Sequence, residues 1–86
     1  MPQYRIEFAP AAKRQFDRLP RDVKDRIAPH IDALAGVPRS HGVRKLSGTK
    51  DQYRIRVGGY RVVYQVRDEE LLVLVVRVAD RKDAYR

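Results

Sequence analysis

The chain has 86 residues, enough for one small domain, and it contains no cysteine, which excludes a disulfide framework and zinc-finger spacing. Its 19 lysines and arginines exceed its 11 acidic residues and give a formal charge of +8, so it is a candidate for binding nucleic acid or an acidic partner protein. His30 and His41 are too few and too isolated for a metal site, and no apolar run begins the chain or reaches the length of a membrane span. We therefore expect a cytoplasmic protein of one domain, residues 1–86, without a metal or cofactor.

The first predicted elements are a short strand and a helix. Tyr4, Ile6 and Phe8 alternate with charged residues, which is the pattern of a half-buried strand. Pro10 suits the first turn of a helix, where its missing N–H is not needed, and Pro20 ends the run. The apolar positions between them, at helical spacing, are Ala12, Phe16 and Leu19.

A second helix is predicted for residues 21–35. Its apolar side chains form one stripe, which consists of Val23, Ile27, Ile31 and Leu34. We expect Gly36 to cap its C-terminus and Pro29 to kink the helix or split it. The two helices together predict an antiparallel pair whose apolar face requires a sheet to cover it.

Residues 36–42 are predicted to be a loop, because they include two glycines, a proline and a serine. Arg39 and His41 lie in this loop, and we interpret both as solvated residues and not as catalysts. Residues 43–46 are predicted to begin another strand, and residues 47–51 form a polar turn.

Residues 52–66 (QYRIRVGGYRVVYQV) predict a β-hairpin, because two alternating runs flank Gly58 and Gly59 and glycine allows the positive φ of a two-residue turn. With that turn, Arg56 lies across from Arg61. The period of two places six residues on one face: Tyr53, Ile55, Val57, Tyr60, Val62 and Tyr64. The other face carries Arg54, Arg56, Arg61 and Arg67, with Val63 and Gln65 among them.

Directly opposed arginines repel each other across a hairpin. Such a face is either a solvated polar surface or an anion site, in which planar guanidinium groups bind phosphate well. The hairpin alone does not choose between the two. We expect the three hairpin tyrosines to pack in or beside the core, and Arg67 and Arg86 to be solvated.

After a turn at residues 68–70, residues 71–78 form a nearly continuous apolar run, typical of a buried central strand. A three-residue turn there would place Arg77 across from Arg61. The order of elements predicts an α+β fold: an N-terminal strand, two antiparallel helices, then a three- to four-stranded antiparallel sheet with the helices packed on one face. The arginines would then lie on the opposite face.

Four segments carry a resemblance to a known family. They are FDRLP at residues 16–20, KLSG at residues 45–48, the hairpin at residues 53–66, and VADRKDAY at residues 78–85. The chain resembles the RelE/ParE superfamily of bacterial and archaeal toxins. The resemblance extends over nearly the whole sequence, and these four segments carry it. The segments YRIR and GGYRVVYQV are more similar to the RelE branch than to the ParE branch, whose members act on DNA gyrase.

The resemblance implies the toxin of a type II toxin–antitoxin system, a ribosome-dependent endoribonuclease that cuts mRNA in the ribosomal A site. The ribose 2′-hydroxyl would attack the adjacent phosphate and leave a 2′,3′-cyclic phosphate and a 5′-hydroxyl. By position in the motifs, the implied catalytic residues are Arg54, Arg56, Arg61, Arg81 and Tyr85. The residues expected to contact RNA are Arg54, Arg56, Arg77, Lys45 and Lys50, although the two lysines could equally be solvated. The implied partners are a cognate antitoxin, the ribosome and mRNA, with operator DNA contacted only through the antitoxin complex.

Arg54 and Arg56 depart from the pattern of the E. coli-like members, which have lysines there, one of them a proposed general base. Arginine keeps its proton in proteins, so these residues can stabilise charge but not abstract a proton. The base would then be Tyr85, a ribosomal group or another group not yet identified. Two other hypotheses remain at this point: a ParE-like gyrase inhibitor without nuclease activity, and a binding module whose arginines dock an acidic partner.

Overall fold

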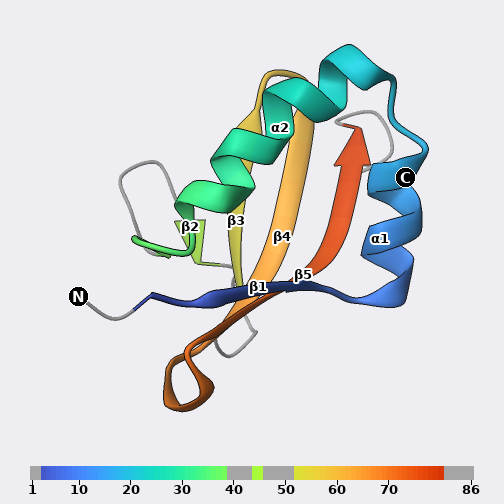
Figure 1. The fold of residues 1–86 in the computed structure, drawn as a ribbon. Helices are drawn as coiled ribbons and strands as arrows, with labels where there is room; N and C mark the ends of the chain where they lie inside the picture. Colours follow the sequence, from blue (N-terminus) through green and yellow to red (C-terminus); the bar gives the residue numbers. More distant parts are fainter. Residues whose placement is uncertain (1–2, 39–43, 46–51, 81–86) are drawn as a thin grey trace.

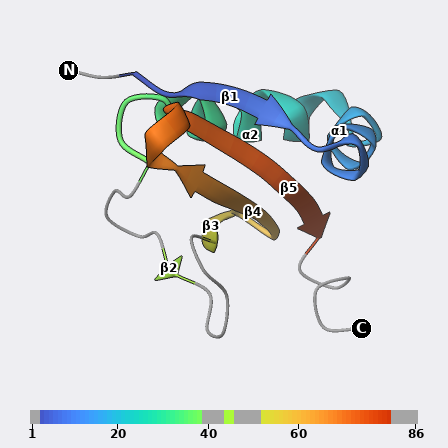
Figure 2. The same cartoon turned by 90° about the horizontal axis from the view of Figure 1, so that it is seen from below.

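One twisted sheet with two helices on a single face makes up the described part of the chain, which comprises residues 3–38, 44–45 and 52–80 of the computed structural model. The strands are β1 (Arg5–Phe8), β2 (Arg44–Lys45), β3 (Gln52–Val57), β4 (Tyr60–Arg67) and β5 (Leu72–Asp80). The helices are α1 (Pro10–Asp17), α2 (Arg21–Ala33) and a short 3₁₀ helix, η1 (Asp68–Glu70). Figure 2 shows α1 and α2 on the same side of the sheet, so the α+β prediction is confirmed.

The sheet has the strand order β1-β5-β4-β3-β2. Strands β2 to β5 are antiparallel neighbours, as predicted, whereas β1 pairs in parallel with β5, from Arg5 opposite Leu72 to Phe8 opposite Val75. The N-terminal strand was expected, but its place at the sheet edge beside the last strand was not. A parallel neighbour requires a crossover, and α1, α2 and the following strands supply it.

The helices follow the predicted proline boundaries at their N-termini. Pro10 is the first residue of α1 and Pro20 is the N-cap of α2. The chain passes along α1 and returns along α2, which crosses over β3 while α1 packs against β5 (Figure 1). Among the described residues, no helix has the length and apolar character needed to span a membrane.

Two expectations about α2 are tested by the structure. Of the two outcomes expected at Pro29, a kink or a split, the split does not occur. Pro29 lies inside the helix and is solvent-exposed, so water can satisfy the carbonyl that loses its N–H partner. The helix ends at Ala33, with Leu34 as its C-cap, and Gly36 is not a left-handed cap. The chain instead leaves α2 through a tightened turn, in which the N–H groups of three successive residues bond the carbonyls three positions earlier. These donors are Leu34, Ala35 and Gly36.

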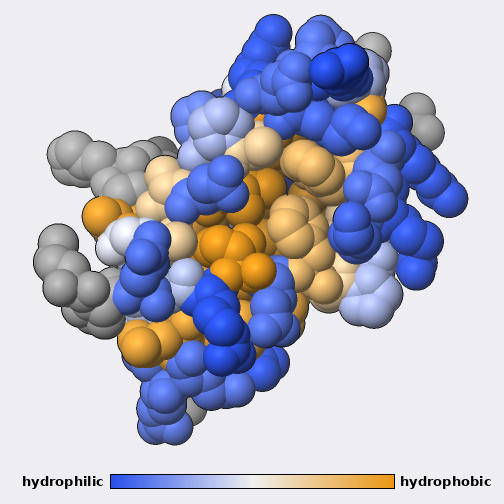
Figure 3. Space-filling view, viewed as in Figure 1, coloured by the Kyte–Doolittle hydropathy of each residue, from blue (hydrophilic) through white to orange (hydrophobic). Residues whose placement is uncertain are grey.

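The core lies between the helices and the sheet face turned toward them. Its buried members are Ala12, Val23, Ile27, Ile31, Leu34, Val57, Val62, Tyr64, Val66, Val73, Val75 and Val78. Half-buried apolar residues pack against it, including Ile6, Phe8, Phe16 and Leu19. Figure 3 shows apolar surface in the hollow between α2 and α1, with hydrophilic residues around it.

Tyr64 fixes the end of the α2 connection to the sheet. Its side chain is fully buried, and its hydroxyl donates a hydrogen bond to the carbonyl of Pro38 at 2.6 Å. Its ring stacks on that of Tyr53, with a centroid distance of 6.0 Å. The prediction that the hairpin tyrosines are packing residues is therefore confirmed for this pair.

Candidate nucleic-acid interface

The β3–β4 hairpin has the register predicted from its glycine turn. Arg56 is the partner of Arg61, and Arg54 is the partner of Val63. Gly58 has a φ of +59°, in the left-handed region that favours glycine, and it is the one glycine of the described residues with a positive φ. The turn therefore depends on Gly58 more than on Gly59.

Four arginines lie on the sheet face turned away from the helices, and we call them the arginine face: Arg54, Arg56, Arg61 and Arg77. Their positions follow from the pleat, because their neighbours Val57, Val62 and Val78 are in the core on the other side. Arg54 and Arg61 are half-buried, whereas Arg56 and Arg77 are exposed. The Nε atom of Arg61 is buried, and the residue has other interactions.

Arg77 does not lie across from Arg61, which corrects one expectation. Ala79 is the partner of Arg61, and Arg77 is the partner of Val63, so the two arginines are diagonal neighbours. Two local features shift the register. The β4–β5 connection includes Leu71 in a left-handed conformation (φ 49°), and a bulge between the pairs of Val63 and Tyr64 gives β5 one extra residue.

Neutral residues separate the arginines of the arginine face along its strands. The other outward positions on β3, β4 and β5 are occupied by neutral residues near the four arginines, among them Gln52, Val63, Gln65, Leu74 and Ala79. Positive charge therefore accumulates on a rigid sheet, where arginine forks can bind planar or tetrahedral oxyanions.

Arg67 lies on the same face of β4 but belongs to a different environment. Its guanidinium pairs with Glu70 at 3.7 Å and donates to the side-chain oxygen of Gln65 at 3.2 Å. Its side chain is exposed, in keeping with the predicted solvated residue. Because its charge is balanced locally, it is a suitable comparison for the arginine face.

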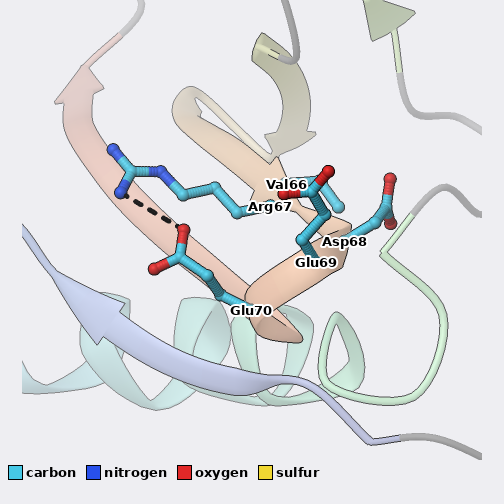
Figure 4. Close-up of a pocket in the computed structure, with 5 residues that line it drawn as sticks. All are labelled: Val66, Arg67, Asp68, Glu69 and Glu70. Atoms are coloured by element: carbon cyan, nitrogen blue, oxygen red, sulfur yellow. Dashed lines mark ion pairs between the residues drawn. The ribbon is translucent and has the colours of Figure 1, made fainter.

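A pocket at the η1 turn is acidic and is not a candidate for RNA. It is lined by Val66, Arg67, Asp68, Glu69 and Glu70. Figure 4 shows Arg67 and Glu70 pointing toward one another, while the carboxylate of Asp68 points away from that pair. Asp68 instead accepts a hydrogen bond from the Tyr4 hydroxyl at 2.6 Å. Three carboxylates in one turn repel phosphate, so RNA is expected to approach elsewhere.

Several predicted site residues lie outside the described part of the chain. They are Lys50, Arg81 and Tyr85, together with Arg39, His41 and Arg86. Lys45 is described only as a strand position, the register partner of Tyr53. Their roles remain predictions. Of the expected site residues, the structure brings together Arg54, Arg56, Arg61 and Arg77, and within the described chain no three metal-ligating side chains cluster.

Two positions near this face were not predicted. Arg44 is the register partner of Arg54 on β2, so the row of arginine positions extends by one strand. Arg26, on α2, places its Nη1 atom 3.5 Å from the position that a Cβ atom on Gly58 would occupy. The sequence predicts a strand near residues 44–45, and its pairing with β3 could have been tried in each register. The approach of α2 to the hairpin turn cannot be predicted from the spacing of residues in the sequence.

The comparisons with known proteins show the family of the chain. A family of sequences described as the ParE toxin of the type II toxin–antitoxin system parDE matches residues 6–85. The chain belongs to the RelE/ParE toxin superfamily. The resemblance on which this membership was expected is thereby confirmed.

Individual members resemble the chain over most of its length. The mRNA interferase toxin RelE of Escherichia coli K12 is 32% identical over 92% of this chain and 84% of its own length. Toxin RelG of Mycobacterium tuberculosis is 31% identical over 96% of this chain and 97% of its own. A chain in the crystal structure of the intact E. coli RelBE toxin–antitoxin complex superposes with a TM-score of 0.82 and 32% identity, covering 90% of this chain and 95% of that one.

The superfamily therefore supplies the fold and the class of type II toxins. The matching family carries the ParE name, whereas the individual relatives carry RelE-type names.

Proposed function

We propose that this RelE/ParE-superfamily protein is a ribosome-dependent endoribonuclease that cuts mRNA in the ribosomal A site. The observation that carries the proposal is the direct opposition of Arg56 and Arg61 on the outward face of the sheet. Two guanidinium groups in this arrangement repel each other, and an anion bound between them lowers that repulsion. A phosphodiester supplies that anion and matches the donor geometry of arginine.

The chemistry requires stabilisation of developing negative charge. The 2′-hydroxyl attacks the adjacent phosphorus, the bond to the 5′-oxygen breaks, and the products are a 2′,3′-cyclic phosphate and a 5′-hydroxyl. The pentavalent intermediate concentrates charge on its nonbridging oxygens, which preorganised donors stabilise. Arg61 is the first candidate for this role, because its Nε atom is buried and its strand position lies on the outward face opposite Arg56. Arg81 is proposed as a second donor.

Arg54 and Arg56 bind phosphate in this proposal and do not act as bases, because arginine keeps its proton. Tyr85 or a ribosomal group accepts the proton of the 2′-hydroxyl, and Tyr85 can also stack on an extruded base. Positioning of the mRNA by the ribosome then supplies much of the rate enhancement. Free RNA is accordingly expected to be a poor substrate.

The test is cleavage of a defined mRNA on programmed ribosomes with an empty A site. Cuts should fall in the A-site codon, require ribosomes, and disappear when the nucleotide at the cut carries a 2′-deoxyribose. The upstream fragment should end in a 2′,3′-cyclic phosphate. Intact mRNA with folded protein, or cleavage of the 2′-deoxy substrate, would contradict the proposal.

The alternative is a ParE-like inhibitor of DNA gyrase, and two observations favour it. The matching family carries the ParE name, and positions 54 and 56 hold arginines where a lysine base is expected for the E. coli-like nucleases. A gyrase supercoiling assay separates the two: inhibition at stoichiometric protein, without loss of mRNA on ribosomes, would establish this second function.

A cognate antitoxin is the proposed protein partner. Structural relatives include RelE–RelB antitoxin complexes from E. coli and Pyrococcus horikoshii. We propose that the antitoxin of this chain shields the arginine face, and that operator DNA is contacted through the complex. The proposed site of action, with ribosomes and mRNA, is the cytoplasm.

A further inference from the structure

The second half of β5 has an edge that no strand covers in the described chain. The pairing of β1 with β5 ends at Phe8 opposite Val75. Beyond that point α1 takes the place of a strand, and the side-chain oxygen of Gln15 accepts the N–H of Val78 at 2.8 Å. The bulge opposite Val63 lies in the same region and turns Arg77 outward.

A pocket of about 370 Å³ lies between the end of α1 and this uncovered edge. Its volume falls within the usual range of small-molecule sites, which begins at about 300 Å³. The lining residues that matter chemically are Gln15, Arg18, Tyr60, Arg77, Ala79 and Asp80. Arg18 is the C-cap of α1, and it is the one arginine of the pocket that comes from outside the sheet.

The lining fits a nucleotide better than a simple anion. Arg18 and Arg77 are exposed, and guanidinium planes stack on bases and bind phosphate. Tyr60 is half-buried and adds an aromatic ring. Asp80 has an interaction of its own, but a carboxylate offers about four acceptor positions and can also accept from the N–H groups of a base edge. A carboxylate would be unfavourable in a site made for phosphate alone.

The pocket adjoins the arginine face directly. Tyr60 lines the pocket and Arg61 follows it in the chain, on the opposite face of β4. Ala79 lines the pocket and is the strand partner of Arg61. Arg77 belongs to both sites. An RNA strand with a phosphate on Arg61 therefore has a neighbouring nucleotide within reach of the pocket.

We propose that this pocket is a subsite for one nucleotide of single-stranded RNA, next to the phosphate that is cut. The proposal rests on the proposed nuclease function for its place in the reaction, but the pocket can be tested without ribosomes. Arg18 stacks on the base or binds its phosphate, and Asp80 discriminates among base edges. The pocket thus contributes to the choice of sequence at the cut.

The test is an NMR titration of the full-length, ¹⁵N-labelled protein with each of the four nucleoside 5′-monophosphates and, separately, with inorganic phosphate. Saturable shifts are expected at the backbone amides of Leu19, Val78 and Ala79, and different nucleotides should differ in affinity. Inorganic phosphate should shift the arginine face without reproducing the pocket shifts.

Arg18→Gln and Arg14→Gln form the matched pair of variants. Both residues are exposed near the end of α1 and both changes remove one charge, but Arg14 does not line the pocket. Arg18→Gln should weaken nucleotide affinity about fivefold to tenfold, as expected for one charge-assisted contact, and Arg14→Gln should leave it unchanged. Well-dispersed spectra show that both variants are folded.

Absent pocket shifts, the same shifts with inorganic phosphate, or equal losses in both variants would overturn the subsite. The outcomes for the nuclease proposal and for the subsite are independent. If the nucleotides bind as expected but ribosome-bound mRNA stays intact, the subsite stands and the nuclease function does not. If mRNA is cut but no pocket shift occurs, the function stands and the subsite does not.

Discussion

Arg56 and Arg61 are direct cross-strand partners in the arginine face, one pair away from the Gly58–Gly59 turn. Neither position contributes to the core, which is built from the alternate residues of the same strands. The hairpin therefore keeps an unfavourable charge pair at a place where a phosphate-binding protein gains from it. This relationship leads to predictions on stability as well as on activity.

Arg56→Thr should raise the free energy of unfolding by about 0.2–1 kcal/mol, because it removes a like-charge pair and introduces a residue that favours strands. Urea denaturation at low salt measures the change. The gain should shrink in about 0.5 M salt, where charges are screened. A loss of stability at low salt would show that Arg56 is held by favourable contacts and is not repelled by Arg61.

Gly58→Ala and Gly59→Ala should differ clearly. A residue with a Cβ at the φ of +59° found for Gly58 costs roughly 1–2 kcal/mol. Gly59 has no positive φ and no atom within 4 Å of an added Cβ, so its substitution should change stability by less than about 0.5 kcal/mol. Thermal or urea unfolding of the two variants measures this, and equal effects would contradict the turn geometry.

Tyr64→Phe should destabilise the fold by about 1–3 kcal/mol, since it leaves the Pro38 carbonyl without its buried donor. Tyr4→Phe is the comparison. It removes an equally short hydrogen bond, from Tyr4 to Asp68, that lies in solvent. Water can replace that bond, so its loss should cost less than about 1 kcal/mol. Urea denaturation measures both losses of unfolding free energy. Equal losses for the two variants would indicate that the Tyr64 hydroxyl is not shielded from water.

Arg54→Gln should weaken binding to a short single-stranded RNA and lower its salt dependence. Each phosphate contact removed reduces the slope of log K against log salt by about 0.7 for single strands. Fluorescence anisotropy over a range of salt concentrations gives the slope. Arg67→Gln should leave it nearly unchanged, because Arg67 pairs with Glu70. Equal slopes for Arg54→Gln and the unmodified protein would remove Arg54 from the RNA-binding face.

The hairpin could be predicted almost completely, because its glycine turn and its period of two together determine the register. Val57 opposite Tyr60 and Arg56 opposite Arg61 follow from that alone. The β4–β5 register could not be predicted in the same way. It depends on Leu71 in a left-handed conformation and on a bulge, and an apolar run of valines and leucines pairs equally well in several registers.

The parts of the site that come from packing were also beyond sequence patterns. Arg26 reaches Gly58, and Arg18 reaches the β5 edge, only because the helices cross the sheet at particular places. Helical spacing predicts which side of a helix is buried, but not which strand it crosses. Pro29 does not split α2, because an exposed proline need not interrupt a helix that packs by its other side.

The most direct test of the central claim compares Arg61→Ala with Arg67→Ala in single-turnover cleavage of mRNA on programmed ribosomes. Both residues lie on the outward face of β4, but only Arg61 opposes a second arginine, whereas Arg67 is balanced by Glu70. Loss of a preorganised charge-stabilising donor should slow Arg61→Ala by about 100- to 1000-fold, and Arg67→Ala should cut at nearly the unmodified rate. Equal rates for the two variants would contradict the assignment of the arginine face as the catalytic site.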